Sequence, residues 1–335
     1  MQSLARATRR LTGAGRRAVA TLTSTLGAQV DTLGDKDFLR VRHQDITWTL
    51  GEFQRHANAL AEGLAEAGYR PGDTIAVWLP NDSEYLVTQF AAARLGLTFI
   101  AVDPAVEGAA NVASVLRTSG CKGFLFGADG IDAVSGAVPE LDAQGAESGS
   151  IKSLEFGGLA HLVTTGWHFE RHGVENFKNL PVYSADALRD GFRATNVLAA
   201  IAPPAAGSAL GAHFTASADG EGPPQMGAAF SHGAAVTQGT AVADTLKLTG
   251  DDVVCITAPL ASPLGFAGVA GALSRTAKTV VPAADFDAVA TMDAIAIEGC
   301  TVLIAEPEQL AELEALCASG AYATASVPSR RLLTL

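Results

Sequence analysis

The sequence has little charge and few aromatic residues for its length. Of its 335 residues, 17% are charged, 6% are aromatic and 48% are hydrophobic, and glycine occurs 35 times. This composition excludes an intrinsically disordered chain and indicates a globular α/β protein with many strand-to-helix turns. The formal net charge of −12 argues against nucleic-acid binding, which requires a surplus of basic side chains. A chain of this length can bury a large core in one to three domains.

Cysteine is scarce, and the hydrophobic runs are interrupted. The four cysteines show no zinc-type spacing, so we expect reduced residues: Cys121, Cys255, Cys300 and Cys317. The uncharged run 253–274 contains Pro259, Pro263, Gly265 and Gly268, so it predicts a buried strand, loop and helix rather than a transmembrane segment. His168 and His172 lie four residues apart without a convincing third ligand, so we predict no metal site.

The first thirty residues contain no acidic side chain. They carry five arginines: Arg6, Arg9, Arg10, Arg16 and Arg17. A basic, Ser/Thr/Ala-rich start without acids is typical of a mitochondrial targeting segment. The alternative is a short basic arm that docks on a partner or a membrane surface. The charge pattern therefore predicts a mitochondrial location, on the matrix side or associated with the inner membrane.

Strand and helix signals alternate along the chain. Thr49 and Glu52 have the spacing of a capping box and predict the start of a helix. Buried strands are expected at 74–79, 97–102 and 123–126, with helices between them, which is a βαβ pattern. We also expect a helix at 185–192 and a strand at 197–201, followed by a flexible segment at 203–211.

The predicted fold class is α/β, with layered βαβ units and mostly parallel sheets. We expect three parts: a basic targeting-like segment or docking arm at 1–30, a first α/β subdomain with a connector at 31–195, and a second α/β subdomain at 196–335.

Three stretches carry a resemblance to a known family. The first joins 47–61 to the Pro-Gly-Asp turn and strand at 71–81, and the second is the helix and strand at 91–104. The third joins 250–260 to 301–307. Together these stretches resemble the N-terminal region of the acyl-CoA synthetase, or AMP-binding, superfamily over about residues 40–335. The resemblance implies the fold of that region, in truncated form.

The family's phosphate loop corresponds to residues 214–232, where most phosphate-binding side chains are replaced. The positions aligned with that loop, none of which we expect to hold a cofactor, are Thr215, Ser217, Asp219, Gly220 and Gly227. The family's lysine falls near Gln225 or Met226, and Asp219 and Glu221 stand where a triphosphate would lie. Like charges at such distances repel by about a few kcal/mol, so we expect weak or no ATP binding. Ser231 is expected to cap the following helix, beside His232.

The resemblance also implies missing parts. Segment 259–265 resembles one in which the family usually carries an aromatic residue and a histidine near the acyl group, but Ala261 and Ser262 stand there. The sequence ends before the family's adenine-binding strand, magnesium-linked Glu, ribose-binding Asp and C-terminal catalytic Lys. These departures predict a chain that is not an enzyme, with no catalytic residues and no cofactor.

The resulting hypothesis is an inactive acyl-CoA-synthetase-like protein that serves as a structural or accessory subunit of a mitochondrial assembly, such as a respiratory-chain complex or the ATP synthase. Its expected partners are other protein subunits, without nucleic acid and without a membrane span of its own. Two alternatives stay open. One is a sensor module that binds acyl-CoA or a nucleotide, and the other is an acyl-adenylating enzyme completed by another chain.

Overall fold

The computed structural model describes residues 20–143, 151–166, 171–182, 197–217, 222–320, 322 and 332–333. The helices are α2 (Leu22–Leu33), α3 (Leu50–Glu66), α4 (Ser83–Leu95), α5 (Ala109–Ser119), α6 (Ile131–Ala137), α7 (Glu140–Ala143), α8 (His232–Thr245), α9 (Pro263–Ser274), α10 (Ala288–Glu298) and α11 (Pro307–Ala318). The strands are β1 (Asp37–Val41), β2 (Ile46–Thr49), β3 (Thr74–Trp78), β4 (Thr98–Val102), β5 (Gly123–Phe126), β6 (His161–Thr164), β7 (Val174–Asn176), β8 (Ala209–Thr215), β9 (Gln225–Met226), β10 (Phe230–Ser231), β11 (Val253–Ile256), β12 (Lys278–Val281), β13 (Val302–Ile304) and β14 (Leu332–Leu333).

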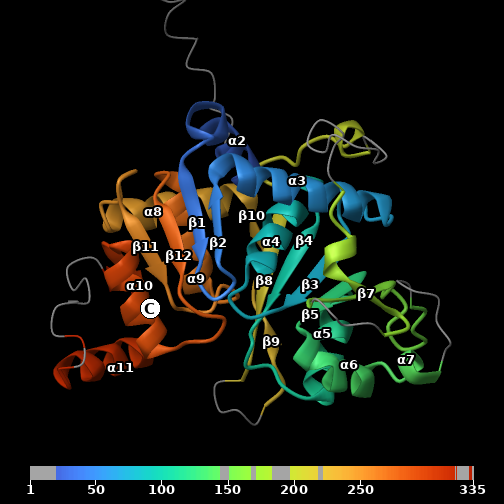
Figure 1. Cartoon of the computed structure of the whole chain (residues 1–335). Helices are drawn as coiled ribbons and strands as arrows, with labels where there is room; N and C mark the ends of the chain where they lie inside the picture. The colour runs from blue at the N-terminus through green and yellow to red at the C-terminus, as the bar shows by residue number, and fades with distance from the viewer. Residues whose placement is uncertain are drawn as a thin grey trace, which may run out of the picture.

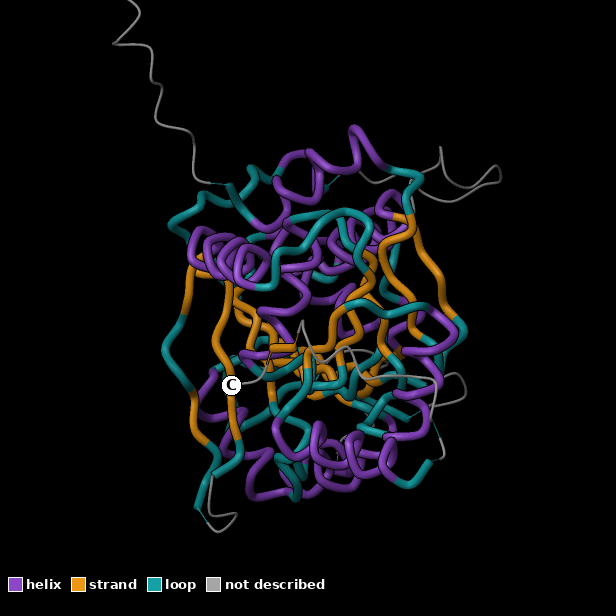
Figure 2. The backbone as a smooth tube through the Cα atoms, turned by 90° about the vertical axis from the view of Figure 1, so that its left-hand side faces the viewer, coloured by secondary structure: helices purple, strands orange, loops and turns teal. Residues whose placement is uncertain are grey.

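Within the described residues the strands form two sheets. Sheet A has the order β14-β13-β11-β12-β1-β2, and sheet B has the order β10-β8-β4-β3-β5-β6-β7, with β9 beside β8. Pairing is parallel except for β1 with β2, β8 with β9 and β8 with β10. In the side view of Figure 2 the strands span the space between helices gathered above and below them. The predicted α/β fold class with mostly parallel sheets is confirmed.

Helices lie between the two sheets and outside each of them (Figure 1). The largest core joins α2, α3, α4, α8 and α9 to inward faces of both sheets. A second core joins α5 and α6 to the other face of sheet B, and a third joins α10 and α11 to the other face of sheet A. In β4, Phe99 and Ala101 belong to the first core, whereas Ile100 and Val102 belong to the second. Burial on both faces explains why the central strands are apolar without alternation.

Local signals set the helix starts. The side chain of Thr49 accepts the backbone N–H of Glu52, whose carboxylate accepts the N–H of Thr49, so the predicted capping box is confirmed. Ser231 caps α8 through Ala234 N–H, as predicted. Ser262 caps α9, which has a proline in its first turn.

Part of the segment read as an N-terminal arm belongs to the folded core. Helix α2 begins at Leu22, and Leu22 and Leu26 are 2% exposed. The helix packs against α3, α4, α8 and α9. Its apolar positions bury when these distant elements surround them, which the local sequence does not reveal. The five arginines lie outside the described residues.

Two further predictions were wrong. The strand expected at 197–201 is a 3₁₀ turn at Leu198–Ala200, and the segment expected to be flexible up to residue 211 already enters β8 at Ala209. The reason for the second error is tertiary, because β8 pairs in parallel with β4 inside sheet B. The helix expected at 185–192 lies outside the described residues. The strand pairing crosses the predicted division at residue 195, since β1 joins sheet A and β8 joins sheet B, and the division itself stays a prediction.

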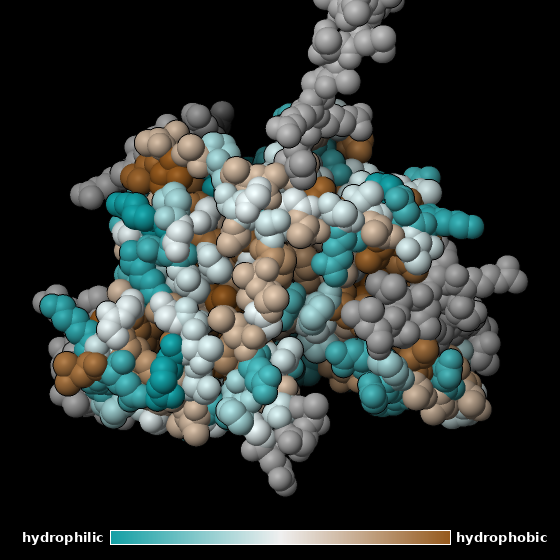
Figure 3. Space-filling model, turned by 180° about the vertical axis from the view of Figure 1, so that it is seen from behind, coloured by the Kyte–Doolittle hydropathy of each residue, from teal (hydrophilic) through white to brown (hydrophobic). Residues whose placement is uncertain are grey.

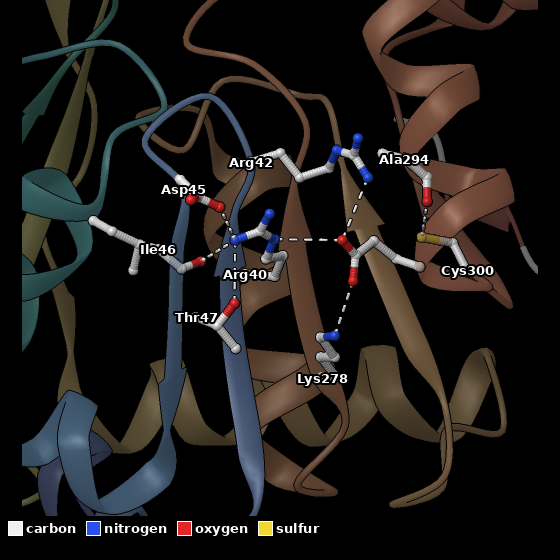
Figure 4. Close-up of polar contacts among 9 residues, drawn as sticks. Arg40, Arg42, Asp45, Ile46, Thr47, Lys278, Ala294 and Cys300 are labelled. Atoms are coloured by element: carbon white, nitrogen blue, oxygen red, sulfur yellow. Dashed lines mark hydrogen bonds and ion pairs between the residues drawn. The ribbon is translucent and has the colours of Figure 1, made fainter.

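A single carboxylate links three cations on sheet A (Figure 4). Glu298, the last residue of α10, lies 3.3 Å from Arg40 Nε, 3.3 Å from Arg42 Nη1 and 3.0 Å from Lys278 Nζ. Burial acts to raise the pKa of Glu298, but the hydrogen bond and charge of Lys278 together with both arginines lower it overall. The cluster therefore fastens α10 to β1 and β12.

Asn81 joins the two sheets at the carboxyl ends of their strands. It follows β3 of sheet B and is 5% exposed. Its Nδ2 donates to the carbonyl of Ala258 at 3.2 Å, and its Oδ1 accepts the N–H of Leu260 at 2.7 Å, both just after β11 of sheet A. Its backbone N–H donates to Ala284, just after β12. One amide side chain thus satisfies buried backbone groups of the opposite sheet.

Large apolar side chains on the surface are scattered. Of those at least 42% exposed among the described residues, only Val289 and Ile297 share an element, α10; the full set is Leu33, Leu154, Met226, Val289 and Ile297. On the face seen in Figure 3, hydrophilic and hydrophobic residues are interspersed. None of the described helices combines the length and apolarity needed to cross a bilayer.

Replacing Asn81 with alanine should destabilise the chain by about 2–4 kcal/mol, because a buried N–H and a buried carbonyl each lose their partner. The measurement is the free energy of unfolding in denaturant. The matched control is Asn111→Ala, which removes an exposed bond to the carbonyl of Glu107 and should stay within about 0.5 kcal/mol of the unaltered chain. Equal stability of the two variants would contradict the role given to Asn81.

Candidate functional site

The carboxyl ends of the parallel strands in both sheets meet in one region, below the central helices in Figure 1. Ligands of open α/β sheets bind at this end of the strands. Strand β8 ends here at Thr215 and leads into the predicted loop. Asp219 and Gly220 lie outside the described residues, as does Glu221. The structure therefore describes the two sides of the loop.

The sides of the loop form a hairpin that leads into helix α8. Strand β9 pairs with β8 so that Thr215 lies opposite Gln225 and Phe214 opposite Met226. Gly227 N–H donates to the carbonyl of His213 at 2.8 Å. Thr215 is exposed, Ser217 is half-buried and Gly227 is exposed. Thr215, Ser217 and Gly227 thus lie along one hairpin, and their part in ligand binding stays a prediction.

The hairpin register decides which side chains face the second sheet. Directly opposed residues of antiparallel strands lie on the same face, and neighbours along a strand alternate. Gln225 therefore shares a face with Thr215 and His213, whereas Met226 shares the opposite face with the buried Phe214. His213 contacts a segment that follows sheet A, so Gln225 is on the face that looks toward sheet A.

An aromatic group lies on that face. His213 Nδ1 is 2.7 Å from the carbonyl of Ala261. Its ring stacks on Phe230, with centroids 5.3 Å apart and planes at 18°, and meets the edge of Phe266 at 6.1 Å. Phe230 and Phe266 lie 5.2 Å apart. Strands β8 and β10 and helix α9 thus bring three rings against the segment in which the sequence shows Ala261 and Ser262.

The bond to Ala261 fixes the protonation of His213. A carbonyl oxygen only accepts, so Nδ1 carries the proton and Nε2 of the neutral ring is an acceptor. Burial lowers the pKa of His213, and the bond to Ala261 opposes this without cancelling it. The ring is therefore neutral near pH 7 and can accept one hydrogen bond.

A fully buried histidine opens helix α8. His232 is 0% exposed, and neither of its ring nitrogens has a hydrogen-bond partner among the described residues. Burial lowers its pKa. Its backbone N–H donates to Ser208, and Ser231 rather than His232 caps the helix. The ring is a buried neutral group of the fold.

A cavity of about 450 Å³ lies at the carboxyl ends of β3, β4 and β5. It is lined by Trp78, Leu79, Pro80, Pro104, Glu107, Gly108, Asp129, Gly130, Asp132, Ala133 and Asp285. Four of these side chains are acidic and none is basic. The walls of this cavity therefore repel anions.

Two more carboxylates lie at these strand ends and influence each other electrostatically. Asp103 follows β4 of sheet B, and Glu306 follows β13 of sheet A and caps the start of α11. Burial raises the pKa of Glu306, and the negative charges of Asp103 and Glu308 raise it further. A triphosphate in this region would meet a negative field. Among the described residues, no group of His, Cys, Asp and Glu is arranged to hold a metal ion.

The sequence-based reading missed the aromatic group. It searched segment 259–265 for an aromatic residue and a histidine, whereas His213, Phe230 and Phe266 come from three other elements. The usable signal was the run at 209–215, which alternates poorly but carries a histidine between apolar residues. Pairing with β4 turns that run into a strand.

Comparisons with a family model and with individual proteins point to the same family. The family model described as AMP-binding enzyme matches residues 26–334. YngI of Bacillus subtilis (strain 168), which carries an acyl-CoA synthetase name, is 25% identical over 88% of this chain and 52% of its own length. The mitochondrial medium-chain acyl-CoA ligase ACSF2 of Mus musculus is 28% identical over 43% of this chain and 24% of its own length.

The fold is shared with a solved ligase structure. The anthranilate CoA ligase AuaEII, in complex with anthranoyl-AMP, superimposes with a TM-score of 0.72 at 15% identity, over 93% of this chain and 54% of that one. The chain thus spans about half the length of YngI and of AuaEII. The predicted similarity to the N-terminal region of acyl-CoA synthetases is confirmed.

The expectation that the chain is not an enzyme is contradicted, because the proteins it resembles in sequence over most of its length are acyl-CoA ligases. That expectation weighed side chains of one loop and parts that would follow residue 335. Phosphate loops also bind through backbone N–H groups, so lost side chains alone do not decide activity.

Acidification should destabilise the fold from about pH 6.5 downward. The unfolded chain protonates its histidines near that pH, whereas burial lowers the pKa of His213 and His232 in the folded chain. The unfolded state then binds more protons, so stability is full above pH 6.5 and falls as the pH drops. The measurement is the unfolding free energy between pH 8 and pH 5.

His232→Leu should make this pH dependence shallower, because it removes one buried group that must stay neutral. The control is His172→Asn at an exposed position, which should leave the curve unchanged. Identical curves for His232→Leu and the unaltered chain would contradict the assignment.

Proposed function

Because this chain belongs to the AMP-binding enzyme family, we propose that it supplies the acyl-binding and nucleotide-facing part of an acyl-CoA ligase. In such a reaction a substrate carboxylate oxygen attacks the α-phosphorus of ATP, which forms an acyl adenylate and releases pyrophosphate. The thiol of coenzyme A then attacks the acyl carbon, a thioester forms and AMP leaves.

The observation that carries this proposal is the bond from His213 to Ala261. It joins the strand that leads into the phosphate-type loop to the segment that follows β11, and the two phenylalanines pack on the same ring. An acyl group beside these rings would be shielded from water, with its carboxylate toward the hairpin. The ligases YngI and ACSF2, and the acyl-AMP complex of AuaEII, support the same reaction class.

The loop sets the expected nucleotide affinity. Thr215 and Ser217 supply hydroxyls, and the loop backbone supplies N–H groups, but the family lysine is replaced by Gln225 or Met226. Carboxylates surround the region at Asp103 and Glu306. We therefore propose that ATP binds through backbone and hydroxyl donors. The affinity for ATP should be lower than in family members that keep the lysine.

The unaltered full-length protein should catalyse exchange of labelled pyrophosphate into ATP that depends on an added carboxylic acid. The assay uses a series of aliphatic and aromatic acids, since the named relatives differ in substrate. Exchange with at least one acid supports the proposal. A folded protein that supports no exchange with any acid, at millimolar ATP and magnesium, overturns it.

A lysine introduced into the hairpin tests where the nucleotide binds. Gln225→Lys places an ammonium group on the face shared with Thr215 and should tighten ATP binding about tenfold, or about 1.4 kcal/mol. Met226→Lys adds the same charge on the opposite face and is the matched control. Equal effects of the two variants on ATP affinity would show that the nucleotide does not bind beside the face that carries Gln225 and Thr215.

We also propose a mitochondrial location. Its support is the acid-free, arginine-containing start of the sequence and the mitochondrial name of the ACSF2 relatives, which match less than half of this chain. Association with other subunits of a mitochondrial assembly is part of this proposal, and its support is the same basic segment, which suits docking as well as targeting.

The full-length chain fused at its C-terminus to a fluorescent protein should localise to mitochondria. Replacing Arg6, Arg9, Arg10, Arg16 and Arg17 by glutamine should abolish this, because import selects for positive charge in such segments. Arg55→Gln is the control, since it removes one exposed charge outside the segment. Equal distribution of all three proteins would contradict the proposal. The native mass in gently solubilised mitochondria then separates a free chain from a subunit.

A further inference from the structure

Helix α2 lies beside α3 at the end of the molecule shown at the top of Figure 1. A second cavity is lined by residues of α2, α3 and α4. Its volume is about 210 Å³. The lining residues are Thr21, Thr23, Ser24, Leu26, Gln54, Ala57, Asn58, Phe90, Arg94 and Pro203. It contains one basic side chain and no acidic one. It shares no residue with the cavity at the carboxyl ends of the strands.

The cation in this cavity has one buried nitrogen without a hydrogen-bond partner. Arg94, in the last turn of α4, has its Nη1 buried with no hydrogen-bond acceptor among the described residues. Burial lowers the pKa of Arg94, and the negative charge of Glu62 opposes this. A buried, unpaired guanidinium nitrogen is costly, and in native proteins such a group usually has a water molecule or an ion beside it.

The carboxylate that acts on Arg94 is already engaged. Glu62 Oε1 accepts the N–H of Val197 at 2.6 Å, and Oε2 accepts the N–H of Leu198 at 2.8 Å. No bond joins Glu62 to Arg94 among the described residues. The guanidinium is therefore left facing the cavity side of α4, with its hydrogen-bonding capacity incompletely used.

Further donors surround the cavity. The hydroxyls of Thr21 and Thr23 lie 3.3 Å apart, so one donates to the other and one hydroxyl hydrogen stays available. Gln54 and Asn58 on α3 add two side-chain amides. The start of α2 adds the positive end of a helix dipole. Leu26 and Phe90 are 2% and 1% exposed and form an apolar wall. Because an apolar wall lowers the local dielectric constant, hydrogen bonds from these donors to an anion are stronger than in water.

We propose that this cavity binds a phosphate group, either free or as part of a small metabolite, with Arg94 as its central ligand. A guanidinium matches two phosphate oxygens in a forked geometry, and the hydroxyl and amide donors serve the remaining oxygens. No acidic side chain lines this cavity, in a chain whose formal charge is −12, and the nearby carboxylate of Glu62 already accepts two backbone N–H groups.

The test is the binding of inorganic phosphate to the full chain at constant ionic strength, measured by calorimetry and by the melting temperature. The unaltered chain should bind phosphate and melt higher as phosphate is added. Arg94→Gln should bind at least tenfold more weakly and lose this response. Arg55→Gln, which removes an exposed arginine from the neighbouring face of α3, should behave like the unaltered chain. Thr23→Val should show an intermediate loss.

The stability of Arg94→Gln in phosphate-free buffer distinguishes a ligand-binding arginine from a structural one. If Arg94 serves a ligand, Arg94→Gln is as stable as the unaltered chain, or more so, in phosphate-free buffer, because a guanidinium nitrogen buried without a hydrogen-bond acceptor is gone. Lower stability of this variant, together with no phosphate response in the unaltered chain, would show a structural arginine and overturn the proposal. Equal phosphate binding by both proteins would also overturn it. Sugar phosphates and phosphopantetheine then distinguish free phosphate from a phosphorylated metabolite.

Discussion

The two sheets depend on contacts made where their strands end, and the buried Asn81 makes three of these. Its side chain donates to one backbone group and accepts from another after β11, while its backbone bonds to the segment after β12. Loops at the carboxyl ends of parallel strands have many backbone groups without ladder partners. An amide side chain has one donor end and one acceptor end, so it satisfies both kinds of group from a single position. This bond pair holds the loops of both sheets in register, and the candidate site is built from those loops.

The central helices impose a second constraint, because α4 and α9 are buried along nearly their whole length and α8 packs directly on α9. Helices α8 and α9 approach so closely that a Cβ on Gly239 would lie 2.7 Å from backbone atoms of Ala270. Small residues along α9 permit this approach, and its Phe266 side chain then reaches His213 and Phe230. The packing of the middle layer therefore sets where the aromatic group lies. Helix packing therefore determines the geometry of the candidate site as much as the loop does.

Sequence signals located most elements that depend on short-range chemistry. The capping box at Thr49 and the cap at Ser231 act over three residues, so their residue types are sufficient evidence. Buried runs such as the one ending at Trp78 also predict strands without any knowledge of their neighbours. Pairing is different: β1 lies beside β12 and β8 beside β4 through contacts between distant segments. Helix α2 shows the same limit, because Leu22 and Leu26 bury only against helices that follow later in the chain. The ring of His213 is found only after β8, β10 and α9 are placed together.

The distribution of charge separates the two ends of the molecule. Carboxylates gather where the strands end, at Asp103, Glu306 and the cavity beside Trp78, whereas the cavity under α2 has a lone arginine. A nucleotide at the first end has to rely on backbone N–H groups and hydroxyls against this field, because neutral donors keep their orientation whatever the surrounding charge. The inference from lost loop side chains to lost activity is contradicted by the family to which the chain belongs, and backbone N–H groups are donors that a side-chain replacement leaves in place. In a loop framed by a fixed hairpin and a capped helix, the backbone is the part that the fold itself supplies.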